Sequence, residues 1–240
     1  MFDTVKYKKF ARIQLKNRWT TPVLVTFFIL IIDILFNVSQ YIGRIPNLFS
    51  LLKEPSLFAF IPSIEDSRPS LLFFQALLLE ALVLFVLRVG QINLHLKMSR
   101  SADPVSFSDF FEGLSLWLRA ILAGLWVSIL VCLWSLLLII PGIIKAFAYS
   151  QVIYLITEYP QLSIRKALLV SKEITNGHKA DIFGAQLSFA GWYILAFLAT
   201  AGIGMLWLEP YYYMTMTNVY HALLKEAVDK GTIKSEDLVG

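Results

Sequence analysis

The sequence is poor in charge, in cysteine and in the residues that build turns. Charged residues make up 16% of its 240 positions, whereas an ordinary soluble domain carries roughly 25%. So few charges cannot cover the surface of a soluble protein of this length. The single cysteine, Cys132, cannot form an internal disulfide, and 12 glycines with 9 prolines exclude collagen-like and proline-rich disordered chains.

Long apolar runs take the place of the missing charges, and hydrophobic residues make up 57% of the chain. In hydrocarbon every backbone polar group has to be paired internally, so an apolar run of ~20 residues predicts a helix. We therefore expect an all-α polytopic membrane bundle of about six transmembrane segments in three hairpins. The expected spans are about 21–42, 70–89, 117–140, 143–157, 182–208 and 211–224.

Proline marks the expected corners of the bundle. Residues 117–157 are almost continuously apolar, and a straight helix of that length would be ~60 Å long, about twice the hydrocarbon thickness. Pro141-Gly142 interrupts this run and predicts the point at which the chain folds back. Glu209-Pro210 interrupts the last apolar stretch in the same way.

Polar and amphipathic segments complete the expected organisation. Ser106 and Asp109 have the spacing of a capping box, which predicts the start of a short helix. Apolar residues of 163–176 fall on one helical stripe opposite charged residues, which is typical of a helix lying on a membrane surface. The expected parts are a basic cytoplasmic helix at 1–20, a bundle at 21–226, surface helices at about 106–116 and 163–176, and a cytoplasmic tail at 227–240.

The distribution of basic residues predicts the orientation. The six-span arrangement places 17 of the 21 lysines and arginines on one side, and this side is expected to be the cytoplasm, together with both termini. The apolar run of 21–42 is longer than the ~7–15 residues of a signal-peptide core and lacks a small-residue cleavage motif, so we expect an uncleaved first span. Trp19, Trp117 and Trp207 lie near expected span ends, as membrane-belt anchors do.

Two carboxylates inside expected spans are the first candidate site. Asp33 lies midway along the first span and Glu80 midway along the second, so a hairpin would bring them to similar depth. Two adjacent carboxylates cannot both be ionised cheaply, which is compatible with a proton-linked relay or a cation site. The structural alternative is a protonated carboxyl that is hydrogen-bonded to a neighbouring helix, for example to Asn37, Gln75 or Gln186.

The two proline-broken returns carry the second candidate site. Lys145 and Glu209 each adjoin a proline break at the expected outer face, so an ion pair could join the two hairpins. Short interrupted segments in corresponding positions are typical of binding sites in transporter folds, and an aromatic belt is the alternative. The candidate polar residues are Asp33, Glu80, Lys145, Tyr149, Gln151, Glu209, Asn218 and His221.

The remaining patterns exclude several function classes. The sequence contains no G-x-S-x-G, H-E-x-x-H or Walker A motif, so we expect neither an enzyme nor a cofactor. Its three histidines and single cysteine are far apart, so we expect no metal site. No stretch of the sequence is polar enough to form a nucleic-acid-binding module. Basic residues before the first span could instead contact anionic lipid headgroups: Lys6, Lys8, Lys9, Arg12, Lys16 and Arg18.

Four blocks resemble one family of proteins of unknown function. PGIIKAFAYSQVIYLI (141–156), SIRKALLVSKEITNGHK (163–179), LSFAGWYIL (187–195) and GIGMLWLEPYYYMT (202–215) together resemble the DUF975 family, and WTTPVLVTFFIL resembles its opening. The resemblance extends over nearly the whole chain, least well at 43–69. It implies a multi-pass protein of the bacterial cytoplasmic (inner) membrane with six helices, and it transfers no catalytic residue.

These observations favour a non-enzymatic accessory or interaction protein that binds lipid or a membrane partner, with a homo-oligomer as one possible assembly. A small transporter or permease that uses the carboxylate pair is the alternative.

Overall fold

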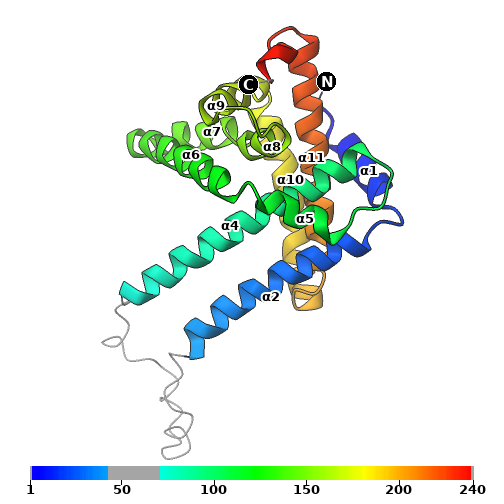
Figure 1. The fold of residues 1–240 in the computed structure, drawn as a ribbon, viewed down its shortest axis with the longest axis vertical. Helices are drawn as coiled ribbons and strands as arrows, with labels where there is room; N and C mark the ends of the chain where they lie inside the picture. The colour runs from blue at the N-terminus through cyan, green and yellow to red at the C-terminus, as the bar shows by residue number, and fades with distance from the viewer. Residues whose placement is uncertain (1, 43–70, 239–240) are drawn as a thin grey trace, which may run out of the picture. The chain divides into compact units, whose positions relative to one another are not determined.

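In the computed structural model, residues 2–42 and 71–238 are described, and every regular element within them is helical. The chain divides into two compact units, one of residues 1–27 and 86–240 and the other of residues 28–85. The helices (Figure 1) are α1 Thr4–Leu15, α2 Thr20–Ile42, α4 Leu71–Arg100, α5 Phe107–Leu114, α6 Trp117–Leu137, α7 Ile139–Ala148, α8 Val152–Glu158, α9 Ile164–Ile174, α10 Lys179–Thr200, α11 Met205–Asp229 and the 3-10 turn η3 Ser235–Asp237.

Within residues 2–42 and 71–238, five helical stretches are long and apolar enough to cross a membrane, which confirms an all-α polytopic architecture. They are Thr20–Asn37, Phe74–Arg100, Trp117–Leu137, Ile139–Glu158 and Lys179–Thr200. The sixth expected crossing, 211–224, lies within α11, which is not one of these five. Its passage through the membrane stays a prediction.

The reversal between α6 and α7 confirms a hairpin and corrects its corner. The chain turns at Leu138, whose backbone is extended at φ −159° and ψ 140°, and Pro141 lies in the first turn of α7. Proline is tolerated there because the first helical N–H groups have no intrahelical acceptor. Gly142 lies so close to the end of α6 that a Cβ atom would come within 2.0 Å of Ser135 Oγ. Pro141-Gly142 therefore starts the returning helix, and the turn itself lies before it.

The reversal between α10 and α11 also precedes the expected break. Ala201 and Gly202 adopt positive φ values of 50° and 90°, and the Gly204 N–H donates to Thr200 Oγ1 at 2.7 Å. α11 then runs from Met205 through Pro210 to Asp229 without a break. The expected end of the span at Leu208 is thus wrong, because a left-handed turn closed by the Thr200 hydroxyl ends α10 eight residues earlier.

Polar residues beyond the expected second span are helical and largely buried. α4 continues to Arg100, beyond the expected end of the second span at residue 89. Gln91 Nε2 donates to Thr26 Oγ1 at 3.4 Å, and His95 Nδ1 lies 2.7 Å from the Gln91 carbonyl oxygen. These partners allow polar side chains to be buried inside a helix that sequence polarity alone ends too early.

The short helix α5 starts as its capping pattern predicts. The Asp109 carboxylate accepts a hydrogen bond from the Ser106 N–H at 2.7 Å and pairs with Lys97 of α4 at 2.9 Å. Burial alone raises the pKa of Asp109, but the hydrogen bonds from Ser106 and Lys97 outweigh it, so the pKa lies below its ordinary value. The ion pair joins α5 to the polar end of α4.

The apolar stripe of α9 faces protein instead of a membrane surface. Ala167, Leu168, Ser171 and Ile174 are buried, and Ser171 Oγ donates to the Ala148 carbonyl at 2.8 Å. The exposed apolar surface lies elsewhere: Leu136 to Ile140, around the α6–α7 turn, are between 67% and 78% exposed. The periodicity of 163–176 therefore predicts the helix correctly. Its apolar stripe, however, is covered by other helices of the protein and not by a membrane surface.

Helix α1 packs along α11 (Figure 1). Ala11 and Leu15 form a buried cluster with Met98 of α4 and Met214 of α11. The basic N-terminal helix is thus part of the packed protein. This packing positions the groove described below.

Candidate functional site

The carboxylate pair of residues 28–85 is brought together by an asparagine. Asn37 Nδ2 donates to Glu80 Oε1 at 3.1 Å and reaches Asp33 Oδ1 at 3.5 Å. The Asn37 amide also donates to the Asp33 backbone carbonyl at 2.9 Å, and Glu80 is only 9% exposed. The two expected carboxylates are therefore neighbours of one amide, which is one of the hydrogen-bond partners expected from the sequence.

Lys145 and Glu209 do not form the expected ion pair; within the described ranges each has another neighbour. Lys145 Nζ lies 4.6 Å from the centroid of the Trp134 ring, and Glu209 Oε1 accepts a hydrogen bond from Tyr193 OH at 3.1 Å. The reason is geometric, because both prolines lie inside helices and do not mark the corners at which the hairpins turn. The pairing expected from the two proline breaks is wrong.

Tyr149 and Gln151 lie in the turn that joins α7 to α8. Gln151 is 5% exposed, and its Nε2 donates to Ser150 Oγ at 2.9 Å. Its Oε1 atom is buried without a hydrogen-bond partner among the described residues. These contacts lie within the turn between the two short helices.

Asn218 and His221 belong to a polar network between α1, α4 and α11. Asn218 Nδ2 donates to Gln14 Oε1 at 2.8 Å, and His221 Nε2 lies 2.9 Å from Ser99 Oγ. One turn away, the buried Glu158 carboxylate pairs with Arg100 and accepts a hydrogen bond from Tyr220. Neither Glu158 nor Arg100 stood out in the sequence, because each lies at the polar end of an apolar helix. This network holds the three helices together.

The six basic N-terminal residues separate into different environments. Arg18 donates to the backbone carbonyls of Met98, Ser101 and Asp103, so it anchors the end of α1. Lys8 Nζ lies 4.2 Å from the centroid of the Phe189 ring, and burial, followed by the neighbouring Arg12, lowers its pKa. Lys6 lies over the Phe10 ring at 5.7 Å, whereas Lys9 and Lys16 are exposed.

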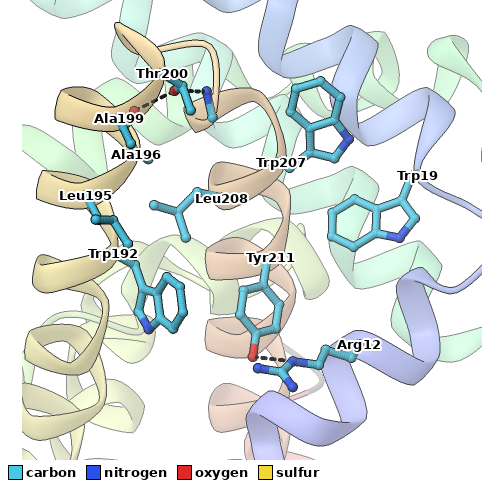
Figure 2. Close-up of a pocket in the computed structure, with 11 residues that line it drawn as sticks. Arg12, Trp19, Trp192, Leu195, Ala196, Ala199, Thr200, Trp207, Leu208 and Tyr211 are labelled. Carbon is cyan, nitrogen blue, oxygen red and sulfur yellow. Dashed lines mark hydrogen bonds between the residues drawn. The ribbon is translucent and has the colours of Figure 1, made fainter.

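Arg12 lines an apolar groove between α1, α10 and α11, shown in Figure 2. The groove has a volume of about 520 Å³, which is within the range of small-molecule and cofactor sites. Its lining residues are Arg12, Trp19, Trp192, Leu195, Ala196, Ala199, Thr200, Gly204, Trp207, Leu208 and Tyr211. Three tryptophans therefore meet here from three different parts of the chain.

One end of the groove is cationic and the rest presents apolar surface. Arg12 Nε donates to Tyr211 OH at 3.1 Å, and the guanidinium carbon lies 5.5 Å from the centroid of the same ring. At the opposite end (Figure 2), the Thr200 hydroxyl donates to the Ala196 carbonyl and accepts from the Gly204 N–H. Because that hydroxyl is already paired, Arg12 supplies the cationic donor of the groove, beside the indole N–H donors of its three tryptophans.

The lining of the groove includes no carboxylate, histidine or cysteine. It can bind an apolar chain and attract an anion. Trp192, Leu195 and Trp207 are 55%, 56% and 49% exposed, so the groove opens at the surface of the helices. Its parts are nearly 200 positions apart in sequence, and only the packing of α1 on α11 brings them together.

Comparison with known proteins places part of the chain in a family. Residues 119–227 match the model of a family described as a protein of unknown function, DUF975. The matched region includes all four blocks between 141 and 215, which confirms the resemblance over this part. No curated protein and no solved structure matches the chain.

Proposed function

Starting from a polytopic helical membrane protein whose residues 119–227 belong to the DUF975 family, we propose a non-enzymatic, lipid-binding role for this chain. The groove between α10 and α11 is the observation that supports it. An acyl chain that leaves the surrounding hydrocarbon would exchange lipid neighbours for the indole rings and aliphatic side chains of the lining. Its headgroup would meet Arg12.

This proposal includes a location. In the expected six-span arrangement 17 of the 21 basic residues lie on the side of the termini, so by the positive-inside rule we propose that both ends lie in the cytoplasm of a bacterium whose inner membrane holds the chain. The proposed accessory role follows from the lack of reactive groups in the groove. A protein that binds lipid without converting it can act only through the complex that it forms with that lipid.

Filling the groove is the direct test. Ala199→Trp on α10 places an indole among the lining residues, whereas Leu198→Trp adds the same ring at a 75% exposed position outside the groove. Native mass spectrometry of the detergent-purified protein should show bound phospholipid on the wild type and on Leu198→Trp. We expect Ala199→Trp to lose it. Equal lipid retention by both variants would contradict the proposal, and a co-purified protein in place of lipid would indicate the partner-binding role.

The arrangement of Asn37 between two carboxylates favours one second candidate, a proton- or cation-linked transporter. An amide that donates to Glu80 while it reaches Asp33 would respond to protonation of either carboxyl. Reconstituted vesicles would then show proton-dependent flux that Asp33→Asn and Glu80→Gln abolish. Vesicles without such flux, at normal yield of folded protein, exclude this candidate.

A further inference from the structure

The cation at the end of the groove distinguishes one class of lipid from another. Arg12 forms no ion pair with any described residue, although it lies at the edge of an apolar surface. Arg12 is exposed, so its guanidinium is free to take a counter-charge from an anion bound at this end of the groove. The presence of Arg12 at this position therefore indicates that the ligand carries an anionic group.

We propose that the groove selects an anionic phospholipid, with the headgroup phosphate on Arg12 and one acyl chain between α10 and α11. The inference rests on the proposed lipid-binding function and adds the identity of the lipid class. Tyr211 occupies one side of the guanidinium, since its hydroxyl accepts a hydrogen bond from Arg12 Nε.

The donors of Arg12 fit a phosphate. The bond to Tyr211 uses Nε, and the two terminal nitrogens donate to no described residue. A guanidinium presents its donors as a planar fork that binds two oxygens of a phosphate at once. In Figure 2 the guanidinium of Arg12 lies beyond the hydroxyl end of the Tyr211 ring, at the end of the groove formed by α1.

The surroundings reinforce the positive end. Lys8 lies one turn before Arg12 on the same helix, with its Nζ beside the Phe189 ring and 3.4 Å from the Ser188 carbonyl. Lys16, the C-cap residue of α1, is exposed one turn after Arg12. Basic pockets between membrane helices are typical sites for anionic headgroups.

The apolar lining favours a lipid over a water-soluble phosphate. Apart from Arg12, the groove offers indole rings, leucines, alanines, a paired threonine and the tyrosine ring. These groups stabilise a hydrocarbon chain by burial, and apart from Arg12 their polar atoms are the three indole N–H groups and two hydroxyls. A membrane supplies phospholipid in large excess, so mass action favours it over scarce free fatty acids.

The test compares two variants that each remove one positive charge from α1. Arg12→Gln removes the groove cation, and Lys9→Gln removes an exposed charge of the same helix. Native mass spectrometry of the delipidated full chain in detergent gives affinities for phosphatidylglycerol and phosphatidylcholine. A lost charged hydrogen bond corresponds to about tenfold or more in affinity. We expect the wild type and Lys9→Gln to prefer phosphatidylglycerol by about tenfold, and Arg12→Gln to lose this preference.

Two further measurements keep the outcomes apart. Arg12→Lys keeps the charge and loses the planar fork, so we expect an intermediate preference. Equal loss in Arg12→Gln and Lys9→Gln would show diffuse charge attraction and overturn the inference. If oleate competes for the groove as well as phosphatidylglycerol does, the ligand is a fatty acid and the inference is also overturned.

The inference and the proposed function fail differently. If the wild type binds both phospholipids equally and Ala199→Trp weakens both, the groove binds lipid without selecting its charge, and only the inference falls. If Ala199→Trp weakens neither, the groove is not the lipid site and both fall.

Discussion

Gly142 provides a quantitative test of the α6–α7 hairpin. In Gly142→Ala the new methyl group would lie 2.0 Å from Ser135 Oγ, 2.8 Å from Ser135 Cβ and 2.9 Å from Ser135 Cα. The hydroxyl can rotate away, but the Cβ and Cα atoms can retreat only if the end of α6 moves. Overpacking that involves the backbone costs about 3 kcal/mol, and alanine returns about 1 kcal/mol of helix propensity. We therefore expect a net loss of about 2 kcal/mol in the free energy of unfolding.

Reversible unfolding in mixed micelles, followed by circular dichroism, measures this loss. Gly191→Ala is the matched control, because no heavy atom lies within 4 Å of the Cβ it would add to α10. That control should gain about 1 kcal/mol from propensity alone. Combining Gly142→Ala with Ser135→Gly should recover part of the loss. A Gly142→Ala variant as stable as Gly191→Ala would refute the close approach of the two helices.

Two further predictions concern the polar contacts of α4, α8, α10 and α11. Hydrogen bonds from Lys230 and then His178 lower the pKa of Glu226, so the folded carboxylate gives stability above its unfolded pKa and loses it as pH falls through the folded pKa. The gap in thermal stability between wild type and Glu226→Gln should therefore shrink in acid, and a gap that is constant with pH would contradict this. Arg100→Gln should cost about 3 kcal/mol and more than Glu158→Gln, because it leaves a carboxylate that is 5% exposed without its cation. Chemical denaturation of the two variants checks this order, and the reverse order would refute the buried pair.

Periodicity and hydrophobicity predict the helices of this protein well, because both follow from local burial. The stripe of α9 and the capping pattern at Ser106 depend on neighbours three or four residues apart, and both helices form where they are expected. Proline was less informative. Pro141 and Pro210 each lie inside a helix, and Ala201 takes the left-handed turn that no residue type at that position announced.

The groove was not predictable from the sequence for a different reason. Arg12 was one of six similar basic residues, and nothing in its local context separates it from Lys9 or Lys16. Its role depends on the packing of α1 against α11, which places it beside Trp192 and Tyr211. Asp33 and Glu80, in contrast, follow from the depth at which charges occur in two consecutive spans, and the structure joins them through Asn37.

The central claim is that the α10–α11 groove holds lipid, and the amount of phospholipid retained by Ala199→Trp and Leu198→Trp measures it directly. Both variants carry one added indole on α10, and only the first lies in the groove. The account predicts that Ala199→Trp emerges from purification without its bound phospholipid, while Leu198→Trp keeps as much as the wild type. Bound phospholipid at wild-type level on both would contradict it.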